Sequence, residues 1–302
     1  TPPFFKGEFF RRHAARKEPP MLKVERISVM NMENAIRGAR NPMNSWARMD
    51  SFYDENHNFI LGENDLSLAS RLAKAGSDHR KFIRQIFVSV DITAPLYWWK
   101  EFDTYKVGTV ANSTSTMHKI HAKEFTIEDF STEHLFNSED VDRELEMDED
   151  RALAAVTVGG DLAYYTPEGF IQMSCNVLNY FRDLYLKTKD KKYWYQMIQL
   201  LPSSYNQRAT LMLNYEVLAN MYHARKNHKL DEWRNFCAWI ETLPYAKELI
   251  VGEEVVKDTK EQLRARFTAY ERRIEYLEKM GITTLTEKDN SLPLALGGLE
   301  KG

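Results

Sequence analysis

The stretch over residues 84–119 constrains the fold most, because a strand pattern turns directly into a helix pattern and then into a hydroxyl-rich segment. Within residues 86–93, aliphatic side chains alternate with other types, which is the period of a strand with one apolar face. Thr93 is expected to cap a helix that has a proline in its first turn and runs to Lys106. Together with the polar segment 112–118, these elements place charged and hydroxyl groups at the end of a sheet, where ligands are often held.

The composition limits the classes of protein to which the chain can belong. Its 302 residues are 43% hydrophobic and 28% charged, enough to bury a large core in one large domain or two small ones. The formal net charge of −3 gives no indication of binding to nucleic acid or anionic lipid. No apolar run reaches the roughly 18–20 residues that span a bilayer, and the N-terminal region lacks a secretory apolar segment. We expect a cytoplasmic protein with no membrane and no nucleic-acid partner.

Neither a disulfide framework nor a metal site is indicated. Cys175 and Cys237 lie in apolar helical patterns and are expected to be buried thiols in a reducing, intracellular setting. Eight of the twelve residues from Glu139 to Asp150 are Asp or Glu, but this run has no internal glycine, which an EF-hand would require. We expect a solvated acidic insert over about residues 123–160 and no bound metal.

Three regions follow one another along the chain. Residues 1–20 show no sustained periodicity and are expected to be a tag or a disordered extension, with a partner-binding basic arm as the alternative. Residues 21–250 form the predicted domain, which contains the acidic insert. Residues 251–302 are expected to form a charged helix over about 258–279 and then a disordered tail.

Helical spacing dominates the second half of the predicted domain. Thr166 is expected to cap a helix to about Lys187, with a proline at its first position. Further helices are predicted where apolar residues recur three or four positions apart, around residues 211–222 and 233–240. In the first half, the patterns predict a strand over 22–29 and helices over 32–40 and 65–74.

A polar group lies in the predicted helix that follows Pro202. Asn214 and Arg225 are eleven residues apart, about three helical turns, so their side chains are expected on the same face. A buried Arg beside an Asn suits a planar ligand with several acceptors, such as a pyrimidine or an isoalloxazine edge. The alternative is that these residues cap or bridge neighbouring helices.

The order and spacing of these residues resemble the flavin-dependent thymidylate synthases. In the C-terminal half, the likeness rests on the run Leu201-Pro-x5-Arg208-x5-Asn214-x10-Arg225, followed by Trp233 in a new helix. In the N-terminal half, the matching positions are Ala39-Arg40, Gly76, His79, Ala94-Pro95 and Ser115, the last at the distal serine of the family's signature motif. The resemblance covers about residues 21–250 apart from the acidic insert.

Several positions depart from the family's pattern. Its Arg-His-Arg becomes Thr104-Tyr105-Lys106, and a lysine cannot reproduce the bidentate geometry of an arginine. Its signature glutamine becomes Glu101, and a glutamate of its flavin site aligns with Arg84. The chain therefore resembles a divergent member with a degenerate signature motif.

The resemblance implies an α+β fold with a central, mostly antiparallel sheet packed against helices and a helical C-terminal half. It also implies FAD as cofactor, methylenetetrahydrofolate and NADPH as further reactants, and a homotetramer with sites at subunit interfaces. In the family, reduced flavin delivers a hydride while the protein orients dUMP. The implied function is therefore methylation of dUMP, or modification at C5 of a related pyrimidine nucleotide. The alternative is a non-catalytic nucleotide- or partner-binding oligomer that retains the fold.

Roles for individual residues follow from the same resemblance. Arg225 is the predicted catalytic residue and contacts the pyrimidine, Ser115 contacts the phosphate, and Asn214 lies at the flavin. The predicted substrate-binding residues are Glu101, Thr104, Lys106, Ser115 and Arg225. The predicted cofactor-binding residues are Asn214, His228, His79, Lys81 and Arg84.

Overall fold

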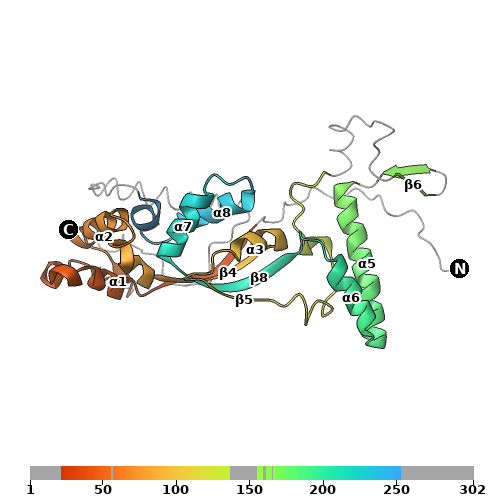
Figure 1. Ribbon diagram of the computed structural model, residues 1–302, viewed down its shortest axis with the longest axis horizontal. Coiled ribbons are helices and arrows are strands. Elements are labelled where there is room, and N and C mark those ends of the chain that lie inside the picture. The colour runs from red at the N-terminus through yellow and green to blue at the C-terminus, as the bar shows by residue number, and fades with distance from the viewer. Residues whose placement is uncertain (1–21, 56, 137–154, 159–160, 165, 253–302) are drawn as a thin grey trace.

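A central antiparallel sheet organises the protein (Figure 1). The computed structural model describes residues 22–136 except 56, and residues 155–158, 161–164 and 166–252. The sheet has four strands in the order β1 (Lys23–Met30), β4 (Phe87–Pro95), β8 (Asn206–Asn214) and β5 (Val110–Ser113), and every neighbouring pair is antiparallel. The predicted α+β class with a mostly antiparallel sheet is confirmed.

The remaining elements flank this sheet. Two short hairpins pair β2 (Phe52–Tyr53) with β3 (Phe59–Ile60), and β6 (Ala155–Val158) with β7 (Asp161–Tyr164). The α-helices are α1 (Met32–Ala39), α2 (Glu63–Lys74), α3 (Leu96–Phe102), α5 (Pro167–Thr188), α6 (Lys191–Leu200), α7 (Tyr215–Arg225) and α8 (Asp231–Ile240). Short 3-10 helices are η1 (Asn41–Met43), η2 (Trp46–Arg48), η3 (Arg80–Gln85) and η4 (Ile127–Asp129), and η6 (Lys247–Val251) is a π-helical turn.

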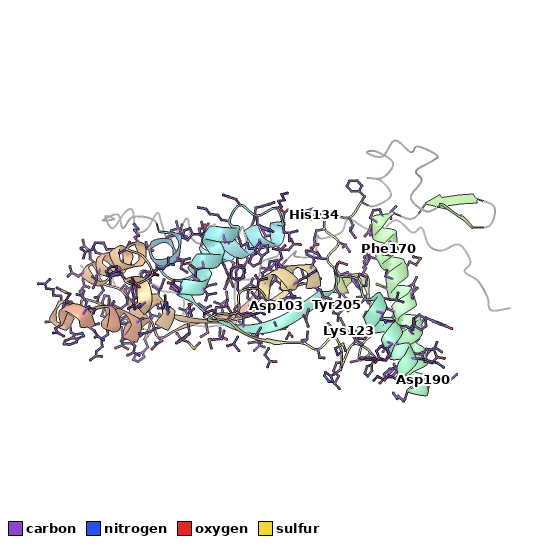
Figure 2. All side chains as sticks on the ribbon, viewed as in Figure 1. Asp103, Lys123, His134, Phe170, Asp190 and Tyr205 are labelled. Carbon is purple, nitrogen blue, oxygen red and sulfur yellow. The ribbon has the colours of Figure 1, made fainter. Side chains whose placement is uncertain are left out.

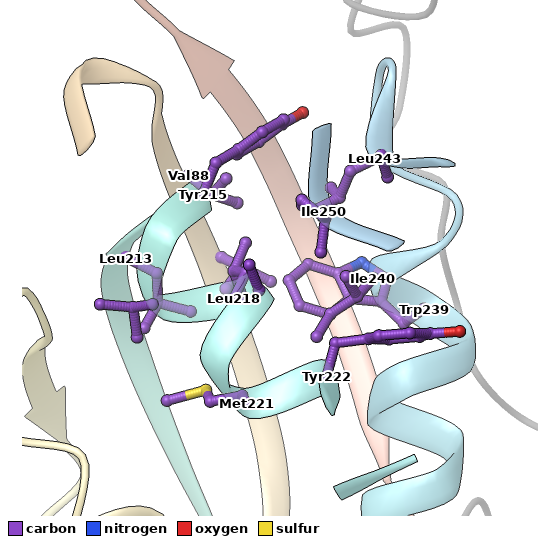
Figure 3. Close-up of a cluster of buried hydrophobic side chains, with 14 of the residues drawn as sticks. Val88, Leu213, Tyr215, Leu218, Met221, Tyr222, Trp239, Ile240, Leu243 and Ile250 are labelled. Carbon is purple, nitrogen blue, oxygen red and sulfur yellow. The ribbon is translucent and has the colours of Figure 1, made fainter. Parts of the chain in front are cut away.

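One face of the sheet carries the main core. On β4, Val88, Val90 and Ile92 are buried, and on β8 so are Leu211 and Leu213, because side chains two residues apart share a face. Against this face lie apolar residues of α1, α3, α7, α8 and η6. Figure 3 shows how the last two helices and η6 interlock in this core, with Leu218, Tyr222, Trp239, Ile240 and Ile250 in one cluster.

A second core lies under the helical hairpin of α5 and α6. Its buried members are Ile120, Phe125, Phe130, Ile171, Cys175, Leu178 and Met197. The hairpin stands at one end of the molecule, whereas α1 and α2 lie at the other (Figure 1). Phe125 and Phe130 fall in the first part of the region predicted as an acidic insert, while the acidic run itself lies outside the described residues.

Several local predictions are confirmed. Thr166 caps α5, because its side-chain oxygen accepts a hydrogen bond of 3.0 Å from the Gly169 amide. Both cysteines are buried and unpaired, and burial raises the pKa of Cys175 to about 11 and that of Cys237 to about 12.

Among the described residues, no helix combines the length and apolarity needed to cross a bilayer. The charged helix predicted over 258–279 lies outside the described residues.

Three local predictions are wrong. The helix predicted from Ala94 to Lys106 is shorter, since β4 continues through Pro95 and α3 ends at Phe102. Proline is tolerated there because it lies at the end of the strand, opposite Asn206. The segment expected as a polar loop begins with the edge strand β5. Residues 206–214 form a strand instead of a helix, because alternate side chains from Ala209 to Leu213 are buried.

Candidate functional site

The sheet topology brings the end of α3 to the end of α7. The helix α3 follows β4 and α7 follows β8, and these two strands are antiparallel neighbours. The two helices therefore start from opposite ends of the strand pair, and both contribute to the core on the same sheet face. Their last turns meet, so Glu101 of α3 contacts Arg225 of α7. This juxtaposition depends on the strand that the sequence analysis had assigned to a helix.

Arg225 is the centre of a polar and aromatic cluster. Its Nε donates to the Tyr105 hydroxyl at 2.9 Å, and its Nη1 donates to Glu101 Oε2 at 2.8 Å. The guanidinium carbon lies 4.7 Å from the centroid of the Trp233 ring and 5.6 Å from that of Tyr105, within the range of cation–π attraction. The Arg225 side chain is 20% exposed, so it is held in place but remains open to solvent.

Three side chains lie close to the Glu101 carboxylate. Its Oε2 accepts from Arg225 and from Trp233 Nε1, the latter at 3.1 Å, and His228 Nε2 lies 3.5 Å away. Two donors on one oxygen hold the Glu101 carboxylate in a fixed position. Its ion pair with Arg225 also compensates the charge of the guanidinium inside the cluster.

Asn214 acts at the other end of α7. It is the N-cap residue, and its Oδ1 accepts from the Val217 amide at 3.0 Å. The loop after Tyr105 passes directly over this cap at Gly108, whose φ is +75°. A Cβ at Gly108 would lie 2.8 Å from Asn214 Nδ2 and 2.9 Å from Val217 Cγ2, so only glycine fits without a shift. The alternative stated for these two residues is confirmed, since Asn214 caps α7 and Arg225, its last residue, bridges to Glu101 of α3.

Of the other predicted substrate-binding residues, Thr104 and Ser115 form hydrogen bonds within the chain and Lys106 is exposed. Thr104 Oγ1 donates to the Glu101 carbonyl at 2.7 Å, while the Lys106 side chain is exposed. Ser115 follows β5, and its Oγ accepts from the Met117 and His118 amides at 3.1 and 2.8 Å. The same Oγ lies 2.9 Å from His118 Nδ1. Among the described residues, no contact links Ser115 to the Arg225 cluster.

The predicted cofactor-binding cations gather near the start of α7. Arg84 Nη2 lies 3.9 Å from Glu216 Oε1. Lys81 is exposed on the same 3-10 helix as Arg84, η3, and the exposed His79 directly precedes that helix. The closest partner of Glu216 is Arg80, at 2.9 Å, a residue that the sequence analysis missed. Arg80 stands in a run of basic residues, which could have singled it out. The second oxygen of the buried Glu216 has no hydrogen-bond partner among the described residues.

Other motif residues have structural roles. Arg208 lies on the opposite face of the sheet and pairs with Asp91, which also accepts from Thr210 at 2.5 Å. Arg40 is buried against Asp65. Tyr105 and Trp233 complete the Arg225 cluster, although only their sequence positions had been noted. Within the described part of the chain, no group of three or more His, Cys, Asp or Glu could hold a metal ion.

Comparison with known proteins bears on the fold. No family model matches the chain, and no curated protein matches it in sequence. A structure of the flavin-dependent thymidylate synthase ThyX from Helicobacter pylori, complexed with FAD and dUMP, is 17% identical with a TM-score of 0.50. That match covers 76% of this chain and 97% of the other. A second structure of the same enzyme with FAD and dUMP gives 16% identity, a TM-score of 0.50, and the same coverage of 76% and 97%.

A weaker likeness links the chain to the UMP/dUMP methylase PolB from Streptomyces cacaoi, bound with 5-Br dUMP. It has 13% identity and a TM-score of 0.46, covering 78% of this chain and 95% of the methylase chain. The two Helicobacter structures show that this chain has the fold of flavin-dependent thymidylate synthases. The predicted resemblance is confirmed at that level.

Proposed function

We propose that the protein binds FAD and a pyrimidine ligand, and that Arg225 orients the pyrimidine ring. The observation that carries this proposal is the held guanidinium of Arg225, which has an Nη2 group without a hydrogen-bond partner among the described residues. Ring carbonyl oxygens of a pyrimidine are suitable acceptors for such a donor. The fold shared with an enzyme solved with FAD and dUMP supports the same assignment.

The residues near the start of α7 fit an anionic cofactor. His79, Lys81 and Arg84 are exposed cations or potential cations there, and Asn214 caps the same helix. These side chains would bind FAD, with His228 contributing from the other end of α7. When bound, FAD supplies hydride-transfer chemistry.

The protein's own contribution to a reaction at C5 is positioning. Arg225 polarises and orients the ring, while Glu101 and Thr104 hold the turn beneath it. Lys106 and Ser115 complete the proposed substrate-binding set. Methylation of dUMP or of a related pyrimidine would also require a one-carbon donor such as methylenetetrahydrofolate and a reductant such as NADPH.

A non-catalytic binding role is the second candidate. It is favoured by the Glu101 carboxylate, which already pairs with the one arginine proposed to act on a substrate. Under this reading the protein retains the fold and binds a pyrimidine or a partner without turnover. In either case we propose a cytoplasmic homo-oligomer, a tetramer as in the resembled family. Exposed apolar residues of α5, namely Phe170, Val177 and Tyr180, support self-association.

A flavin titration tests this proposal. We expect the purified protein to shift the visible spectrum of added FAD, and deoxyuridine or dUMP to perturb the bound-flavin spectrum. Arg225→Ala should abolish the pyrimidine effect and keep flavin binding, whereas Arg71→Ala, at an exposed position of α2, should change neither. A protein that leaves the FAD spectrum unchanged would contradict the proposed function.

A further inference from the structure

We infer that Tyr105 is a second hydrogen-bond donor to the ligand, and that its hydroxyl and the Arg225 guanidinium bind the same carbonyl oxygen of the pyrimidine ring. This inference rests on the proposed function, because it adds a residue to the same site. Its basis is the direction of the hydrogen bond between the two side chains and the protons that this bond leaves available.

Tyr105 is held in place from several sides. Its backbone amide donates to the Phe102 carbonyl at 3.0 Å, which fixes the turn after α3. Its ring packs against that of the buried Trp233, with the two centroids 6.0 Å apart. The guanidinium carbon of Arg225 lies 5.6 Å from the centroid of the Tyr105 ring. The hydroxyl therefore has a set position beside Arg225 before any ligand binds.

The bond between Arg225 and Tyr105 can run in one direction only. Arg225 Nε donates to the Tyr105 hydroxyl at 2.9 Å, and a guanidinium has no acceptor, so the proton of the hydroxyl must point elsewhere. Among the described residues, no acceptor receives that proton. A hydroxyl that accepts from a charged group is polarised and becomes a stronger donor. Tyr105 thus brings an available proton to the cluster.

The shape of the guanidinium places this proton next to a second one. In arginine, the Nε proton and one Nη2 proton are parallel and lie on the same edge of the planar group. The Tyr105 oxygen occupies the Nε position of this edge, whereas Glu101 is bound at Nη1. An acceptor that binds Nη2 on this edge lies directly beside the tyrosine oxygen. It can therefore receive protons from Arg225 and Tyr105 together.

A ring carbonyl oxygen fits this pair of donors. It has two lone pairs, so it can accept from both groups at once. Two donors on one carbonyl oxygen stabilise negative charge there, as in an oxyanion hole. The ligand ring would then be fixed by one of its two carbonyl groups, with Tyr105 and Arg225 setting its orientation jointly.

Tyr105→Phe tests this inference, because it keeps the ring and its packing but removes the hydroxyl. In calorimetric titrations of the full chain with FAD added, we expect the affinity for dUMP to fall about three- to tenfold. The shift of the flavin spectrum and the midpoint of urea unfolding should stay as in the wild type. Tyr195→Phe makes the same change at an exposed position of α6 and should leave the dUMP affinity unchanged.

Analogues of dUMP with sulfur in place of either ring carbonyl oxygen test the contact itself, because sulfur is the weaker acceptor. One analogue should bind the wild type less tightly than dUMP does, and in Tyr105→Phe this penalty should shrink at least about threefold. A purely structural role of Tyr105 would give independent, additive losses.

Two results overturn this inference while the proposed function stands: an unchanged dUMP affinity in Tyr105→Phe, or additive losses with both sulfur analogues. Additive losses would also be the outcome if the two donors bound a phosphate oxygen instead of the ring. Flavin binding by a wild-type protein that does not bind dUMP overturns the pyrimidine part of the proposed function, and this inference with it.

Discussion

Arg40 and Asp65 form a buried ion pair whose carboxylate is fully hydrogen-bonded. Arg40 Nε donates to Asp65 Oδ1 at 2.5 Å, while Oδ2 accepts from the Ser51 hydroxyl and from the Ser51 and Asp50 amides. Burial alone would raise the pKa of Asp65, but the bonds from Ser51 and Arg40 outweigh it and keep that pKa below its ordinary value. Arg40, which matches a position of the family pattern, thus forms a structural ion pair that links the end of α1 to α2.

Arg40→Met should lower the free energy of unfolding by about 3–5 kcal/mol, because it leaves a buried carboxylate without its partner. Arg37→Met, at an exposed position of the same helix, should change it by less than about 0.5 kcal/mol. Urea denaturation at neutral pH measures both. Because the folded-state pKa of Asp65 is depressed, its contribution is present above the unfolded pKa and is lost as pH falls through the folded pKa. The gap between wild type and Arg40→Met should therefore narrow in acid, and a constant gap would contradict this account.

The residues of the site were easier to predict than their partners. The family resemblance singled out Glu101 and Arg225 separately, but nothing in the sequence indicated that they pair. Pairing depends on where two helices end after they leave neighbouring strands, which is a property of the sheet topology. Gly108 was missed for the same reason, since its close approach to Asn214 joins segments 106 positions apart.

At the scale of elements, amphipathic helices were predictable and the strand β8 was not. The ends of α1 and α5 lie within one residue of their predicted positions. Residues 206–214 contain apolar side chains at alternate positions, but Leu211 and Tyr215 also fit a helical spacing. The ladder to β4 decides between the two patterns, because it pairs all nine residues of β8. The edge strand β5 carries few apolar residues, and pairing with β8 alone defines it.

The helix α5 carries a second apolar stripe that faces away from its core. Phe170, Val177 and Tyr180 are 54%, 37% and 62% exposed. With Met173 and Leu184 they follow the three- and four-residue spacing of a helix–helix seam. Figure 2 shows Phe170 near the first turns of this 22-residue helix, with Asp190 beyond its far end. Val177 is the middle residue of this stripe, and two copies can pair antiparallel along it.

Val177→Glu should therefore weaken self-association, raising the dissociation constant at least about tenfold, because it places a charge at the centre of the proposed seam. Light scattering coupled to size-exclusion chromatography, over a range of protein concentrations, measures the mass. Asn176→Glu makes the same charge change at the neighbouring exposed position and should leave the mass unchanged. If Val177→Glu has the wild-type mass at every concentration, α5 is not the seam.

At the scale of the whole molecule, the two cores pack different elements. The sheet core contains both α7 and α8, which hold Arg225 and Trp233, whereas the second core lies under the α5–α6 hairpin at one end of the molecule (Figure 1). Local contacts within a core set the free energy of local opening. The hairpin should therefore be able to open without disturbing the Arg225 cluster.

Two methionine truncations test this division. Met197 in the hairpin core and Met221 in the sheet core are both 0% exposed, so each change to Ala should cost about 2–5 kcal/mol in its own core. Hydrogen exchange followed by mass spectrometry should show faster exchange in α5 and α6 for Met197→Ala, with β4 and β8 still protected. Met221→Ala should instead speed exchange in the sheet and in α7. Because Arg225 is the last residue of α7, only Met221→Ala should also weaken pyrimidine binding. If both variants speed hydrogen exchange equally across the chain, the molecule opens as one unit and the division into two cores is wrong.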